Sequence, residues 1–137
     1  MSLVHDNEVL SYEVDLRREK IILHTLYDSR GLIEYTDVNF DGVLCHMFEH
    51  QLQGSIILDI NDYELELFFK NKENIKLLDK NKDYGWPLIY DNIDQFKEKL
   101  RQAEYKYIVI MSAYGLNGWV LAKDYKIQVK QKEEVKD

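Results

Sequence analysis

The order in which structural patterns follow one another is the feature of this chain that most constrains its fold. Five strand-like segments come first, helical segments follow, and further strand-like segments close the sequence. A doubly wound parallel sheet needs strands that alternate with helices, so this order argues against that architecture. It favours an antiparallel sheet with helices packed against one face.

The five leading segments have patterns that are typical of strands. In the first, apolar side chains occupy every second position from Leu10 to Leu16, which predicts a half-buried strand. The later segments are rich in β-branched and aromatic residues, and turn signals such as Asp41-Gly42 separate them. We expect the five strands at residues 10–16, 20–27, 32–40, 43–50 and 55–60.

The period changes to that of helices after residue 60. Asn61 or Asp62 can cap a first helix by accepting a backbone hydrogen bond. A second short helix is expected within residues 71–82. Asp91 or Asn92 can cap a third helix, whose apolar residues recur at spacings of three and four.

The chain closes with β-prone segments. The strongest of them covers residues 105–112, and Asn117-Gly118 then predicts a tight turn into a strand at 119–122. Residues 124–130 favour a last short strand. The closing segments therefore predict a hairpin that returns to the sheet after the helices.

These patterns predict one α+β domain over residues 1–137. We expect an antiparallel β-sheet of about six or seven strands, with two or three helices packed on one face. Residues 1–7 and 131–137 are expected to be frayed ends, because chain termini are poorly ordered unless other elements hold them.

The segment from His46 to His50 has two incompatible interpretations. On a helix, the two histidines would share a face and could bind zinc, with Glu49 as the general base of a peptidase. On a strand, Glu49 points away from both histidines, so no such site forms. We favour the strand, because the segment lies among other strands and no downstream residue marks a third zinc ligand. A zinc hydrolase on these residues is therefore not expected.

The only cysteine, Cys45, excludes an internal disulfide and a zinc site built from several cysteines. It alternates with Val43 and Met47, which is typical of a small core residue. On a strand the neighbouring His46 points to the opposite face and could not easily deprotonate the thiol. Asp37, Asp41, Asp59 and Asp62 match no calcium loop, and no phosphate-binding loop is present. We predict no cofactor, no metal and no catalytic residues.

The net charge of −7 is unevenly distributed along the chain. Residues 1–68 contain 14 acidic and 4 basic residues, whereas residues 69–137 contain 11 acidic and 14 basic residues. An acidic half argues against nucleic-acid binding, because phosphate contacts need clustered Lys and Arg. It suits a basic protein partner, although acidic residues can also simply solvate the outer faces of strands.

Several acidic and aromatic residues are candidates for partner binding. Tyrosine and tryptophan are favoured as interface anchors, and those in or near loops are better candidates than those in strands, although core filling is the alternative for each. The predicted partner-binding residues are Asp37, Asp41, Glu49, Tyr84, Trp86, Tyr90, Tyr114 and Trp119.

Three segments resemble a group of small proteins of Gram-positive bacteria: Val38–Glu49, Gly54–Ile60 and Ser112–Ala122. The resemblance extends in order from about Val14 to Ala122. Members are often encoded beside secreted or wall-associated toxins, and some look like immunity proteins, which bind a toxin domain in the cytoplasm and block it. The resemblance implies a strand over residues 40–48 and offers no catalytic residues.

Together these features predict a non-enzymatic, cytoplasmic protein-binding module. The resemblance suggests an immunity-type inhibitor of a cognate toxin, with a basic toxin domain as partner. A small-ligand-binding or homo-oligomerising domain is the alternative, and the sequence leaves the oligomeric state open. No run of about 18 apolar residues and no signal-peptide pattern is found, so neither a membrane partner nor export is expected.

Overall fold

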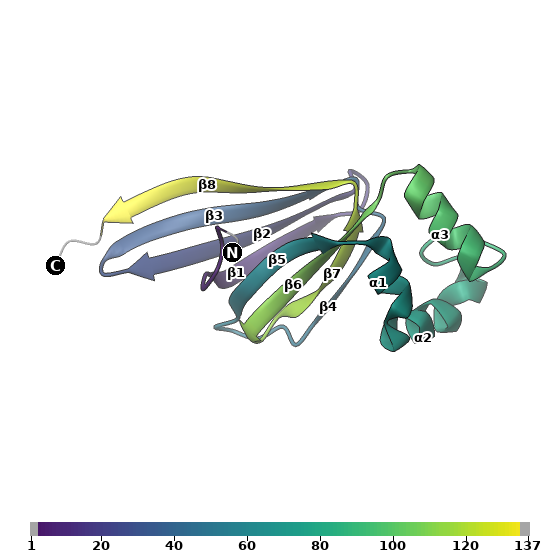
Figure 1. The fold of residues 1–137 in the computed structure, drawn as a ribbon. Helices are drawn as coiled ribbons and strands as arrows, with labels where there is room; N and C mark the ends of the chain where they lie inside the picture. Colours follow the sequence, from purple (N-terminus) through teal and green to yellow (C-terminus); the bar gives the residue numbers. More distant parts are fainter. Residues whose placement is uncertain (1–2, 135–137) are drawn as a thin grey trace.

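The computed structural model describes residues 3–134, which form an α+β fold built on one antiparallel sheet (Figure 1). The elements in chain order are β1 (Glu8–Asp15), β2 (Lys20–Ser29), β3 (Leu32–Asp41), β4 (Cys45–Glu49), β5 (Ile56–Tyr63), α1 (Leu65–Lys70), α2 (Lys72–Asn81), the 3-10 helix η1 (Lys82–Tyr84), α3 (Ile93–Gln102), β6 (Lys106–Tyr114), β7 (Asn117–Ala122) and β8 (Asp124–Glu134).

The sheet has eight strands, so the expected number of six or seven is wrong. The last strand-like segment was expected to be short, but β8 is 11 residues long and pairs with β3 along its length. Its alternating lysines and glutamines are polar because β8 forms an edge of the sheet, where charged residues are common.

The sheet bends into two halves that face each other. The strand order is β4-β7-β6-β5-β1-β2-β3-β8, and the register between β1 and β5 contains a single pair, Glu8 with Ile56. The first half therefore consists of β1, β2, β3 and β8, and the second half of β5, β6, β7 and β4.

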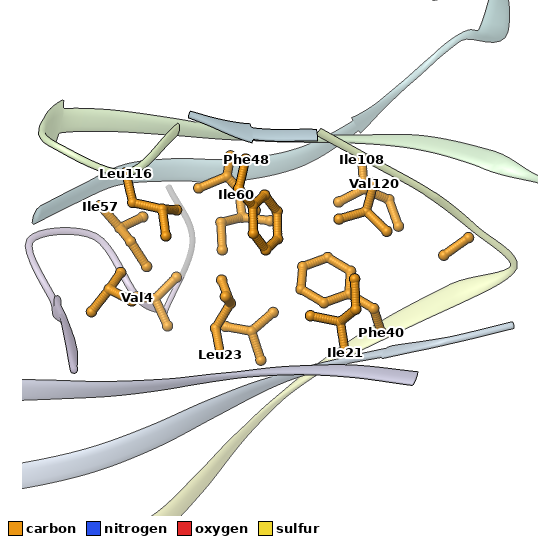
Figure 2. Packing of buried hydrophobic residues seen from close by; sticks show 14 residues of the cluster. Val4, Ile21, Leu23, Phe40, Phe48, Ile57, Ile60, Ile108, Leu116 and Val120 are labelled. Carbon is orange, nitrogen blue, oxygen red and sulfur yellow. The ribbon is translucent and has the colours of Figure 1, made fainter. Parts of the chain in front are cut away.

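An inner core fills the space between the two halves (Figure 2). Ile21 and Leu23 of β2 and Phe40 of β3 face Ile108 and Val120 from the second half, and all five side chains are fully buried. Burial of each such side chain contributes about 1.5–3 kcal/mol. Alternate side chains of β2 and β3 therefore close the two halves over each other. The expectation of a half-buried strand at residues 10–16 is wrong in its burial, because Leu10, Tyr12, Val14 and Leu16 are all exposed and β1 contributes Val9 to this core.

The N-terminal segment is part of the inner core, contrary to the expectation that residues 1–7 are frayed. Val4 is fully buried between the halves (Figure 2). The Asn7 side chain donates a hydrogen bond of 3.0 Å to Thr25 Oγ1, and the Asp6 amide donates to the Ile57 carbonyl at 2.8 Å. At the other end, residues up to Glu134 belong to β8, whereas 135–137 and 1–2 lie outside the described residues.

A second core, here called the helical core, joins the helices to the outer surface of β4, β6 and β7. Phe68 of α1, Leu78 of α2 and Phe96 of α3 are buried there with Trp119 and Leu121 of β7. No described side chain of the first half belongs to this core. The expectation of helices on one face is thus too simple, because the helices cover only part of the outer surface of the second half and leave the outer surface of the first half open.

Two local signals were assigned to the wrong positions. Strand β5 continues to Tyr63, which pairs with Tyr107, so Asn61 and Asp62 cap no helix. The turn that was predicted at Asn117-Gly118 lies instead at residues 115–116, because β6 ends at Tyr114 and Asn117 already begins β7. The cap of the third helix is confirmed, because Asn92, one of the two expected residues, caps α3. Asn71 caps α2.

Candidate protein-binding face

The uncovered outer surface of β1, β2, β3 and β8, here called the open face, carries many carboxylates. The strand register places these acidic residues on it: Glu8, Glu13, Asp15, Asp28, Asp37, Asp41 and Asp124. Within β1, β2, β3 and the part of β8 that ends at Gln128, the same register places only two lysines there, Lys20 and Lys126. Because strands alternate their side chains, these residues share one face while their neighbours fill the inner core.

His24 lies near the middle of the open face, between two of the carboxylates. Its Nδ1 is 2.9 Å from Asp37 Oδ1 on β3, and its Nε2 is 3.0 Å from Glu13 Oε1 on β1. A neutral imidazole carries one N–H, so only the doubly protonated ring can donate to both carboxylates at once. The arrangement therefore links three adjacent strands through one charged ring.

The two carboxylates favour the charged form of His24. The pKa of His24 is raised above its ordinary value of 6.5, mainly by the hydrogen bond to Asp37, while burial acts in the opposite direction and the hydrogen bond to Glu13 adds to the rise. The ring is only partly exposed and Asp37 is nearly covered, whereas the Glu13 side chain is 68% exposed. In this trio of His24, Asp37 and Glu13, the Glu13 side chain is thus the one that solvent or a partner can most easily reach.

Other carboxylates of the open face have loose ionic contacts. Lys20 Nζ lies 3.6 Å from Asp41, Arg18 lies 3.8 Å from Asp15, and Lys106 lies 3.5 Å from Asp124. Exposed pairs of this kind contribute about 0–1 kcal/mol and are easily exchanged. These pairs leave the acidic character of the face available to an incoming cation.

Apolar side chains also contribute to the open face. Ile22 and Leu26 of β2 and Ile33 and Tyr35 of β3 lie on it and are half-buried. A mixture of charged groups with partly accessible apolar groups is the composition of ordinary protein interfaces. The open face therefore offers both electrostatic attraction and apolar surface to a partner.

The predicted acidic residues are only partly brought together. Asp37 and Asp41 of β3 both lie on the open face. Glu49 is exposed at the end of β4, which belongs to the second half of the sheet. Sequence reasoning missed Glu13 and His24, because their role depends on the pairing of β1, β2 and β3. The alternation of polar residues in those strands was the available signal, but it does not reveal which strands are adjacent.

The predicted aromatic residues do not form one surface. Tyr84 and Tyr114 are 86% and 52% exposed, and Trp86 is half-buried at the margin of the helical core. Tyr90 and Trp119 are only 6% and 7% exposed, so their interpretation as accessible loop aromatics is wrong.

Both buried rings are fixed by aromatic neighbours in the helical core. Tyr90 stacks on Phe96 with 4.8 Å between ring centroids, and Trp119 meets Phe68 edge-on at 5.0 Å. Such pairs add about 0.5–1.5 kcal/mol to the burial of the rings. Core filling, the alternative for every aromatic candidate, therefore applies to these two.

The His46–His50 segment is a strand, as we favoured. His46 packs against Phe48 with 5.0 Å between ring centroids, and His50 lies beyond the end of β4 with its Nδ1 3.3 Å from Asn117 Oδ1. The helical zinc-peptidase geometry is therefore not formed. Within residues 3–134 no group of three or more His, Cys, Asp or Glu side chains could hold a metal ion.

Cys45 is a core residue, as its alternation predicted. It is buried in the helical core, and burial raises the pKa of its thiol to about 12. The thiolate is the reactive form of cysteine, so this side chain is inert at neutral pH.

Three surface hollows bear on ligand binding. One, of about 190 Å³, lies between the end of β1 and the start of β4, and Val14, Leu16 and His46 line it. A second, of about 390 Å³, lies between α2 and α3, with Ile75, Tyr90 and Ile93 among its walls. A third, of about 500 Å³, lies between β1 and residues 51–55. Ligand pockets commonly have volumes of about 300–1,000 Å³, so the second and the third have the size of a typical ligand site, and the second is the one with mainly apolar walls.

Comparison of the chain with protein-family models, with curated proteins and with solved structures finds no significant match in any of the three. The resemblance to immunity proteins therefore stays a prediction. No helix in the described part of the chain has the length and apolar character needed to cross a membrane.

Proposed function

We propose that this chain is a non-enzymatic protein-binding module, and that the open face is its binding surface. The observation that carries the proposal is the acidic, uncovered outer surface of the first half, beside a second half whose outer surface is partly covered by helices. Complementary charge speeds association and selects partners of opposite sign. The partner that suits this face is a basic protein domain.

In its most specific form, the proposal is an immunity-type inhibitor that binds a basic toxin domain in the cytoplasm. Two features support this form: the resemblance of residues 38–49, 54–60 and 112–122 to that group of proteins, and the acidic open face. An inhibitor acts by covering the site of its target, so it needs a complementary surface and no chemistry of its own.

The test is co-expression with a toxin encoded beside the gene, followed by affinity purification and a growth assay. We expect a one-to-one complex that salt weakens, because exposed charge pairs are screened. The double variant Glu13→Lys and Asp41→Lys should weaken binding and protection. A control with Glu73→Lys and Asp83→Lys changes the same charge on the helical side, and should bind as the wild type does. Equal loss in both double variants would contradict the assignment of the open face, and a chain that neither binds nor protects would contradict the immunity role.

The hollow between α2 and α3 favours a second candidate, a small-ligand-binding domain. Its apolar walls are Ile75, Tyr90 and Ile93, and Lys82 at its rim donates a hydrogen bond to the Asp91 carbonyl at 2.8 Å. Fragment screening by NMR would test this candidate. Shifts concentrated on the amides of α2 and α3 would support it, whereas shifts absent from both helices would exclude it.

A further inference from the structure

We propose that His24 is a proton-controlled switch on the open face, in which the imidazolium and a cationic group of the partner compete for the Glu13 carboxylate. The inference rests on the proposed function, since it concerns how that same face meets a basic partner. It adds a regulatory property, namely that association is linked to the loss of a proton from His24.

The geometry of the trio supports competition at Glu13 and not at Asp37. Both carboxylates lie within 3.0 Å of the ring, but the Glu13 side chain is 68% exposed and the Asp37 side chain 14%. When the ring loses one proton, its remaining N–H can donate to only one carboxylate. The hydrogen bond to the covered Asp37 is the one that the neutral ring keeps, because solvent can replace the ring at Glu13.

No other charged group takes over the role of His24. In the strand register, Ser11 of β1 and Asp37 of β3 lie directly opposite His24, and Gln128 of β8 follows next to Asp37. Glu13 is the diagonal neighbour on β1. The charged groups whose interactions shift the pKa of His24 are Asp37 and Glu13. The charge of this part of the face therefore follows the protonation of one ring.

The consequence for binding has a definite direction. At acidic pH the imidazolium neutralises part of the face and occupies Glu13. As the pH rises through the elevated pKa of His24, the face loses one positive charge and Glu13 becomes free to pair with a Lys or Arg of the partner. Binding should therefore strengthen with rising pH, by about two- to five-fold, which is what one exposed ion pair contributes.

The first experiment examines the free protein. An NMR titration of the histidine rings from pH 5 to 9 should give His24 a midpoint above 6.5. The Glu13→Gln variant should lower the His24 midpoint. A His24 midpoint at or below 6.5 would overturn the proposal without reference to any partner.

The second experiment uses an N-acetylated, C-amidated hexa-arginine peptide as the cationic probe, because it has no terminal charges and its guanidinium groups stay charged over this pH range. The wild type should bind it about two- to five-fold more tightly at pH 9 than at pH 6, with amide shifts on β1, β2 and β3. His24→Gln should remove this pH dependence, whereas His50→Gln should keep it. A His24→Gln variant that retains the dependence, or a peptide that leaves these strands unperturbed, would contradict the switch. Failure of the toxin co-expression alone would contradict only the proposed function.

Discussion

At the scale of single residues, Gly118 determines how closely β7 approaches β4. Its φ is +153°, and a Cβ atom built on it would lie 1.9 Å from the Met47 carbonyl oxygen. No Cβ atom fits at that distance, so the backbones of β4 and β7 can approach this closely only because residue 118 is a glycine. The glycine is needed inside the strand, and the sequence alone placed it in a turn.

Replacement of Gly118 by alanine should therefore separate β4 from β7. We expect Gly118→Ala to lower the free energy of unfolding by about 2–4 kcal/mol, through strain and overpacking. Urea denaturation would measure the change. Gly54→Ala is the matched control, since Gly54 also has a positive φ but has open space around its Cβ position; a similar loss in both variants would show that only the backbone conformation matters.

Cys45 provides a second prediction at this scale. Burial in the helical core, with a thiol pKa of about 12, should make it unreactive toward a disulfide reagent such as DTNB at pH 8. Reaction should become rapid when urea unfolds the protein. Rapid labelling of the native protein would show that the helices do not close over β4 as the structure has them.

At the scale of elements, the pairing between strands decides which side chains lie next to one another, and the sequence pattern of a single strand does not reveal this. Local sequence patterns predicted strands at the places of β1, β2 and β3, but His24, Glu13 and Asp37 are brought together by the register between these strands. The same limit explains Trp119, which begins an expected strand next to a turn signal and is predicted to bind a partner because it lies near that turn. It lies in a strand whose outer surface the helices cover, and no local pattern encodes which half of the sheet they choose.

The trio across β1, β2 and β3 predicts a pH dependence of stability. The pKa of His24 is raised in the folded state, so its stabilising contribution is fully present below the unfolded value of about 6.5 and is lost as the pH rises through the folded value. Urea unfolding of the wild type and His24→Gln should thus differ most at pH 5–6 and converge toward pH 9. A difference that grows with pH would contradict the sign of the shift.

At the scale of the whole molecule, the protein has three layers: the first half of the sheet, the second half, and the helices. The second half has a core on each side, so that adjacent residues of β6, Tyr107 and Ile108, belong to different cores. The α+β class and the antiparallel sheet were predictable from the order of elements. The bend at the single pair of Glu8 with Ile56 was not, because it arises from the absence of further pairing between β1 and β5.

Val4 is buried in the inner core, so the segment that precedes β1 is important for the stability of the whole fold. Val4→Ala should lower the free energy of unfolding by about 2 kcal/mol, because it removes two buried methyl groups and leaves a cavity. Leu3→Ala is the control, since Leu3 is 72% exposed and should have little effect. Equal, small effects from both substitutions in thermal unfolding would show that the segment does not hold the halves together.

The path of the chain between the two halves has a consequence for synthesis. The first half begins with β1, β2 and β3, but its fourth strand is β8, which is made after the other seven strands and adds Tyr125 and Ile127 to the inner core. A nascent chain that ends near Lys123 presents the whole edge of β3 and an open core to chaperones and proteases. We expect such a truncated chain to be degraded in pulse proteolysis where the full chain resists. Formation of β8 would then be the step that makes a newly synthesised chain resistant to proteases.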